Sequence, residues 1–106
     1  MVEKDFWKQA IQKKLNEQVD LIDKYRRFDF ELYLFGSALL KRFPHDLDIV
    51  ITYPYSSMLE ARAVRDETAS ILREAFLLPV DVILMSYEEE QQACFLTQEH
   101  AELVLP

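Results

Sequence analysis

The sequence predicts an α/β fold of the α+β type, a small mixed β-sheet covered by helices, from three observations. Two long segments, residues 4–27 and the stretch from Ser57 to Pro79, carry apolar residues at helical spacing. Three shorter segments are rich in apolar and β-branched residues, as strands are. Helical and strand-like segments alternate, so the expected order is α-β-α-β-α-β-α without repeats or linkers.

The first half of the chain is expected to form a helix, a strand, a short helix and a second strand. Residues 4–27 place apolar side chains three and four apart among polar ones. Residues 29–35 alternate acidic and apolar side chains before becoming wholly apolar, which predicts a strand entering a sheet. Residues 37–43 follow as a short helix with Ser37 as its N-cap. Residues 46–53, rich in Ile, Val, Thr and Tyr, form the next strand.

The second half continues the alternation. Ser57 is the expected N-cap of a long helix, with Glu60 placed to complete a capping box. A proline ends that helix, and residues 80–85 form the third strand. Residues 87–99 are expected to be helical again. Residues 101–105 fit either the last turn of that helix or a short edge strand, and the pattern does not decide between them.

The composition indicates one domain over residues 1–106, with an N-terminal helix at 1–27 and a motif-bearing core at 29–100. The net charge of −7 argues against tight non-specific binding of nucleic acid, which needs clustered cations. This net charge is compatible with a nucleotide ligand, because bound magnesium can supply positive charge. The single cysteine, Cys94, excludes an intramolecular disulfide and a cysteine-rich zinc site. No segment predicts a membrane span or a signal peptide, so a cytoplasmic location is expected.

The candidate phosphate-binding and metal-binding residues lie at and shortly after the only glycine of the chain. Average usage would give a chain of this length about seven glycines, yet the single one, Gly36, stands between an apolar run and Ser37. Glycine at such a turn lets backbone N–H groups approach a phosphate. Asp46 and Asp48 follow, two residues apart on a predicted strand, so their side chains share one face. Divalent metal commonly compensates such paired carboxylates, although a solvated strand edge would also accommodate them.

A third carboxylate, Asp81, lies inside the predicted apolar strand at 80–85. An aspartate in this setting is costly unless it is paired, protonated or bound to a metal. If that strand neighbours residues 46–53, the side chains of Asp46, Asp48 and Asp81 would surround one cavity.

This combination resembles the polymerase-β-like nucleotidyltransferase superfamily, and most closely its minimal nucleotidyltransferase group, over about residues 25–100. The residues that carry the resemblance are Phe35-Gly36-Ser37, Asp46-Leu47-Asp48 and Asp81. It implies a nucleotidyltransferase-like fold in which Gly36 and Ser37 hold nucleotide phosphates. The eight residues from Ala38 to His45 form a shorter segment than is usual in the minimal group, and they include Lys41, which could reach a phosphate.

The resemblance also implies an activity. Asp46, Asp48 and Asp81 would bind two Mg²⁺ ions, with Asp81 on the catalytic one. The expected reaction is the transfer of a nucleotide, most plausibly AMP from ATP or another NTP, to a hydroxyl group. As in antitoxins of the minimal group, the acceptor could lie on a partner protein, such as a helical HEPN-type toxin.

Two alternatives stay open at this level. The same fold could act as a catalytically silent binding module that neutralises a partner by direct contact. It could also be one subunit of a larger enzyme whose acceptor site comes from an adjacent chain, and a homodimer is compatible with the sequence. Base preference and acceptor identity are not predicted.

Overall fold

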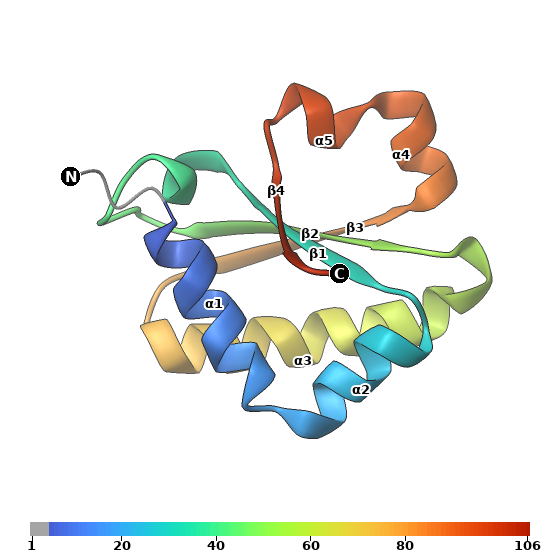
Figure 1. Cartoon of the computed structure of the whole chain (residues 1–106), viewed down its shortest axis with the longest axis horizontal. Coiled ribbons are helices and arrows are strands. Elements are labelled where there is room, and N and C mark those ends of the chain that lie inside the picture. The colour runs from blue at the N-terminus through green and yellow to red at the C-terminus, as the bar shows by residue number, and fades with distance from the viewer. Residues whose placement is uncertain (1–4) are drawn as a thin grey trace.

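The computed structural model describes residues 5–106, which form a four-stranded sheet with helices on both faces (Figure 1). The helices are α1 (Phe6–Asn16), α2 (Val19–Arg27), α3 (Met58–Phe76), α4 (Tyr87–Ala93) and α5 (Phe95–Gln98), with short 3₁₀ turns η1 (Gly36–Leu39) and η2 (Tyr55–Ser57). The strands are β1 (Glu31–Phe35), β2 (Leu47–Tyr53), β3 (Val80–Ser86) and β4 (Glu102–Leu105). The predicted α+β class is confirmed.

The sheet is mixed, with the strand order β3-β2-β1-β4. β1 pairs antiparallel with both β2 and β4, whereas β2 and β3 run parallel and are connected through α3. The parallel pairing needs a long crossover, which α3 supplies. This order places the carboxyl end of β1 beside the amino-terminal ends of β2 and β3.

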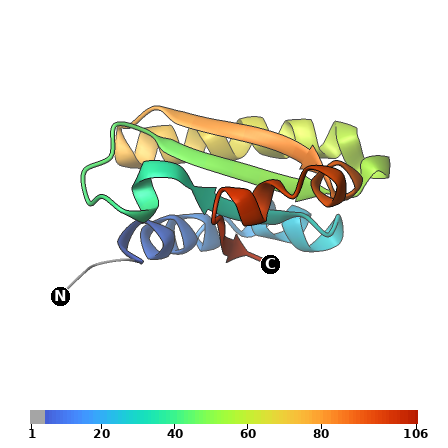
Figure 2. The ribbon, with the colours of Figure 1, turned by 90° about the horizontal axis from the view of Figure 1, so that it is seen from above.

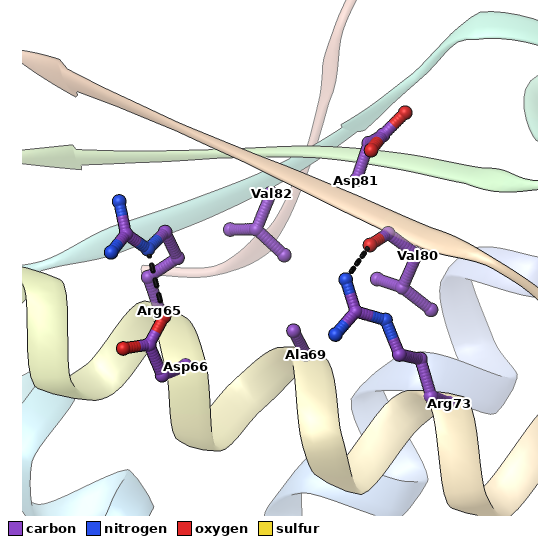
Figure 3. A pocket seen from close by; sticks show the side chains of 7 residues that line it. All are labelled: Arg65, Asp66, Ala69, Arg73, Val80, Asp81 and Val82. Atoms are coloured by element: carbon purple, nitrogen blue, oxygen red, sulfur yellow. Dashed lines mark hydrogen bonds and ion pairs between the residues drawn. The ribbon is translucent and has the colours of Figure 1, made fainter.

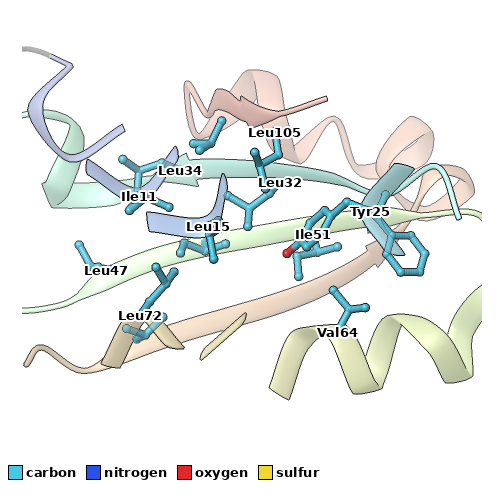
Figure 4. Packing of buried hydrophobic residues seen from close by; sticks show 14 of the residues in the cluster. Ile11, Leu15, Tyr25, Leu32, Leu34, Leu47, Ile51, Val64, Leu72 and Leu105 are labelled. Atoms are coloured by element: carbon cyan, nitrogen blue, oxygen red, sulfur yellow. The ribbon is translucent and has the colours of Figure 1, made fainter. Parts of the chain in front are cut away.

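The main core lies between the sheet and the helices α1, α2 and α3, which all cover the same face (Figures 1 and 2). Alternate residues of β1 and β2, including Leu32, Leu34 and Ile51, are fully buried against this helical layer (Figure 4). The shorter helices α4 and α5 lie on the opposite face (Figure 1). Asp48 and Asp81 lie at one end of that second face. Asp48 is half-buried and Asp81 is exposed.

The first and the last of the predicted helices, residues 4–27 and 87–99, are each divided in the structure. The helix expected over 4–27 is two helices in the described residues, because Gln18, with φ −97° and ψ 85°, leaves the helical conformation between α1 and α2. Residue 4 lies outside the described residues. The helix expected over 87–99 is interrupted by Cys94, whose φ of 52° is left-handed. Residues 101–105, left open by the sequence, contain the edge strand β4.

Two predicted helix caps are wrong. Ser57 precedes α3 but makes no capping hydrogen bond through its side chain, so the expected capping box with Glu60 is not formed. The capping box in the described chain lies instead at α4, where Ser86 accepts from the Glu89 N–H and Glu89 accepts from the Ser86 N–H. Ser37 is not an N-cap either, because it lies within η1, a 3₁₀ turn that ends at Leu39.

No helix among residues 5–106 combines the length and the apolar character that crossing a membrane requires.

Candidate metal centre

Three aspartates meet at one end of the sheet. Asp46 lies in the turn before β2, Asp48 is the second residue of β2, and Asp81 is the second residue of β3. Asp48 and Asp81 are register partners across the parallel pair, so their side chains leave the sheet on the same face. One carboxylate oxygen from each of the three residues lies within 4.8 Å of the other two. The residues that the sequence nominated as metal ligands are therefore brought together.

The electrostatics of the three carboxylates are unfavourable without a cation. Burial, and after it the charges of Asp46 and Asp81, raises the pKa of Asp48 above its usual range. In the described part of the chain no Lys or Arg forms an ion pair with any of the three aspartates. Carboxylate oxygens are the ligands that Mg²⁺ prefers, and a divalent ion would offset this mutual repulsion. The donor set therefore fits magnesium.

Two arginines, Arg65 and Arg73, lie between β3 and α3. A cavity of about 430 Å³ between β3 and α3 is lined by Arg65 and Arg73 together with the start of β3 (Figure 3). Arg73 donates from Nη2 to the Val80 carbonyl at 2.7 Å, and Arg65 pairs with Asp66 at 3.0 Å. The Asp81 side chain points away from α3 and from both guanidinium groups (Figure 3). These two cations are thus engaged with the Val80 carbonyl and with Asp66, and not with Asp81.

Gly36 lies directly against one of the three aspartates, Asp48. Phe35 is the register partner of Asp48 across β1 and β2, so the next residue turns beside the Asp48 carboxylate. Gly36 has a φ of +79°, and a Cβ at this position would collide with Asp48 Oδ2 and lie 3.3 Å from Asp48 Cβ. Glycine is required here both by the left-handed backbone and by the close approach.

Ser37 and Lys41 lie on the far side of this turn. The Ser37 carbonyl accepts from the N–H groups of Leu40 and Lys41 at 3.0 and 2.8 Å, which closes η1. Ser37 and Lys41 both line a cavity of about 520 Å³ with Gly36, so the structure places all three nominated phosphate-binding residues together.

The opposite wall of that cavity was not predicted. It is formed by the end of α5, the turn that follows and the start of β4, and it contains Gln98, Glu99, His100 and Glu102. No sequence pattern indicates this proximity, because the pairing of β4 with β1 is what brings the turn close to Gly36.

A scan against protein-family models, a search of curated proteins and a search of solved structures each return no match for this chain. The geometry of the carboxylates and of the Gly36 turn is therefore the basis for any functional proposal.

Proposed function

We propose that this protein is a Mg²⁺-dependent nucleotidyltransferase that moves a nucleotide, AMP from ATP, to a hydroxyl group. The observation that carries the proposal is the convergence of Asp46, Asp48 and Asp81 beside the Gly36 turn. In two-metal sites for phosphoryl transfer, carboxylates hold the ions, and the ions stabilise the attacking and leaving oxygens. A cytoplasmic setting, in which ATP and magnesium are both available, is part of the proposal.

Each nominated residue has a role in this reaction. Asp46 and Asp48 would hold Mg²⁺, and Asp81 would complete the ligand set. The bound metal supplies positive charge for the phosphates and lowers the pKa of the acceptor hydroxyl. The N–H groups and hydroxyl of Gly36 and Ser37 would position the terminal phosphates, with Lys41 adding positive charge.

The reaction is a single in-line displacement. The acceptor oxygen forms a bond to the α-phosphorus while the bond from that phosphorus to the bridging oxygen breaks, and pyrophosphate leaves. Asp81, the most exposed of the three carboxylates, is the proposed acceptor of the hydroxyl proton. The chain is too acidic for a non-specific nucleic-acid surface, which favours a protein hydroxyl as the acceptor.

The test follows the transferred nucleotide. The protein is incubated with Mg²⁺ and ATP labelled at the α-phosphate, with and without the protein encoded beside it, and label on protein is measured. Label that disappears in Asp48→Asn and persists in Asp20→Asn supports the proposal, since Asp20 is an exposed aspartate on α2 outside the centre. Label that is equal in both variants contradicts it.

A second candidate is stoichiometric binding of a partner by a silent member of the same fold. It is favoured by large apolar side chains left in solvent, among them Leu40, Phe43 and Leu77, which are 87%, 85% and 86% exposed. A stable complex with the neighbouring protein that forms without ATP or Mg²⁺ and survives Asp48→Asn, while no label is transferred, would favour this candidate over catalysis.

A further inference from the structure

The sheet has two edge strands, β3 and β4, and they differ in how their edges are covered. α1 holds β4, because Gln12 donates from Nε2 to the Val104 carbonyl at 3.1 Å. Lys8, also on α1, pairs with Glu102 at 3.7 Å. β3 pairs with β2 on one side and, in the described chain, faces no strand on the other. An uncovered edge strand is a template for the addition of a further strand.

One hydrogen bond at the start of β3 fixes the direction of its backbone groups. The Pro79 carbonyl accepts from the Leu47 N–H at 2.9 Å, so it points toward β2. In a strand, the N–H and C=O of one residue point to one side and those of the next residue point to the other. The residues whose backbone groups point to the free edge are therefore Val80, Val82, Leu84 and Ser86.

Both ends of this edge are already occupied. Arg73 donates from Nη2 to the Val80 carbonyl at 2.7 Å, and the Ser86 N–H belongs to the capping box of α4. Between these ends lie the N–H and C=O groups of Val82 and Leu84, which face no strand because β3 is the edge of the described sheet. These groups form the open part of the edge.

The open part lacks the features that keep strand edges from pairing. Residues 82–85 contain no proline and no charged side chain, which are the usual protections of an edge. Ile83 projects from the same face as Asp81 and is 40% exposed. A strand added here would satisfy the open backbone groups and cover Ile83 with an apolar side chain of its own.

On the opposite face, an added strand would lie above the cavity of about 430 Å³ between β3 and α3 (Figure 3). α3 packs more against β3 than against β2, so this helix forms the floor below the edge. Neighbouring strands lie about 4.8 Å apart, and alternate side chains of a strand share one face. Every second side chain of the added strand would therefore face the arginines of α3.

Arg65 and Arg73 give this floor its positive charge. They are about 12 Å apart along the axis of α3, and residues four apart in a strand are separated by a similar distance, about 13 Å. Each guanidinium has more N–H donors than the single bond given above uses. Of the two carboxylates that line the cavity, Asp66 pairs with Arg65 and Asp81 points to the other face (Figure 3). Carboxylates on the side of the added strand that faces α3 are therefore complementary to the arginines.

We propose that the β3 edge binds an extended acidic segment of a partner protein as an additional strand, with its acidic side chains over α3 and its apolar side chains over Ile83. This inference does not rest on the proposed function, because it uses neither metal binding nor the Gly36 turn. A second copy of this chain fits the edge less well. Pairing of two β3 strands would bring two copies of α3 below strands about 5 Å apart, whereas packed helices need about 8–10 Å.

Amide hydrogen exchange of the whole protein in EDTA, followed by NMR, tests the backbone pairing. In the free protein the amides of Val82 and Leu84 should exchange much faster than those of Ile83 and Met85, which point to β2. A capped synthetic peptide that alternates Glu and Val should slow exchange at Val82 and Leu84. Binding without this protection, or no binding at millimolar peptide, overturns the proposal. Protection of both amides in the free protein overturns it too, and a dimer in sedimentation would then assign the edge to a second copy.

Matched variants test the charge complementarity. Arg65→Glu and Arg73→Glu should each weaken binding of the peptide about fivefold, because attraction to a carboxylate becomes repulsion. Lys13→Glu makes the same change in net charge on α1, which covers the other edge of the sheet, and should leave binding unchanged. Equal effects of the Arg65 and Lys13 substitutions contradict the proposal.

A second peptide tests the acidic character of the partner without altering the protein. The same sequence with Lys in place of Glu should bind more weakly, although the net charge of −7 on the protein favours a basic peptide. Equal or tighter binding of the Lys peptide overturns the assignment of an acidic segment to this edge.

Discussion

Gly36 packs so closely against the carboxylate of Asp48 that a side chain at position 36 would collide with it. The contact arises from register, since Phe35 pairs with Asp48 and the chain turns immediately afterwards. The phosphate-binding turn and the metal centre of the proposed function are therefore one structural unit. A change in either residue is expected to alter the other.

Gly36→Ala should destabilise the protein and disturb the metal centre. The left-handed backbone alone costs about 1–2 kcal/mol for a residue with a Cβ, and the new Cβ would displace the Asp48 carboxylate as well. Urea unfolding measures the total loss. In an Asp48→Ala background the colliding oxygen is gone, so the same substitution should cost less. An equal cost in both backgrounds would show that the contact contributes nothing.

Asp48→Asn should stabilise the metal-free protein while abolishing metal binding. Removal of one of three adjacent charges relieves repulsion, for which we expect a gain of a few tenths to about 1 kcal/mol in EDTA. Unfolding in EDTA and in Mg²⁺ provides the comparison. The parent should gain stability from Mg²⁺ and the variant should not, whereas Asp20→Asn should behave as the parent does. A variant that is less stable than the parent in EDTA contradicts the expected repulsion.

The raised pKa of Asp48 predicts an unusual pH dependence of stability. Because burial, Asp46 and Asp81 hold the pKa above the ordinary carboxyl value of 3.8, the folded state binds more protons than the unfolded state between the two values. The contribution of Asp48 to the free energy of unfolding therefore decreases as pH rises from 3.8 through the folded pKa.

The difference in unfolding free energy between parent and Asp48→Asn, measured in EDTA across this interval, isolates the Asp48 contribution from the other carboxyl groups. As pH rises, the parent should lose stability relative to Asp48→Asn. If the parent instead gains stability relative to Asp48→Asn as pH rises, the folded state stabilises the ionised carboxylate, which contradicts the prediction.

Ser86→Ala should destabilise the protein by about 1 kcal/mol, because it removes the N-cap of α4 and half of its capping box. Ser57→Ala is the matched control. Its hydroxyl makes no capping bond to α3, so the expected change stays within about 0.5 kcal/mol. Thermal or urea unfolding of both variants distinguishes them, and similar losses at the two sites would contradict the structure.

These two serines illustrate why the sequence predicted elements better than their ends. Both begin a Ser-x-x-Glu pattern, Ser57 with Glu60 and Ser86 with Glu89. Ser86 has the extended backbone of an N-cap, with φ −68° and ψ 158°, whereas Ser57 follows the turn η2 with φ −111° and ψ 32°. The pattern is local, and the backbone that enters the helix is set by the preceding strand or turn.

Chain turns were the least predictable part of the fold. Asp29, Leu77, Cys94 and His100 adopt positive φ in the described residues, although none is a glycine. Leucine and cysteine are poor signals for such a conformation, so the break between α4 and α5 could not be inferred. The break near Gln18 likewise has no glycine or proline to mark it.

The candidate site was more predictable because its geometry depends mainly on the pairing of two neighbouring strands. The parallel pairing of β2 and β3 aligns Asp81 with Asp48, as the sequence predicted for neighbouring strands. Asp46 was predicted on the same strand as Asp48 but lies in the turn before β2, and that turn brings its carboxylate to the other two. The neighbourhood of His100 depended on β4, whose four residues carry no distinctive pattern. The open edge of β3 depended on the order of the strands in the sheet, which periodicity does not supply.

The most direct test of the central claim is a titration of the protein with Mn²⁺, followed by electron paramagnetic resonance of the free ion. We predict saturable binding of one or two ions that is abolished in Asp48→Asn and retained in Asp20→Asn. Binding that is absent in the parent, or equal in the two variants, would contradict a metal centre at Asp46, Asp48 and Asp81.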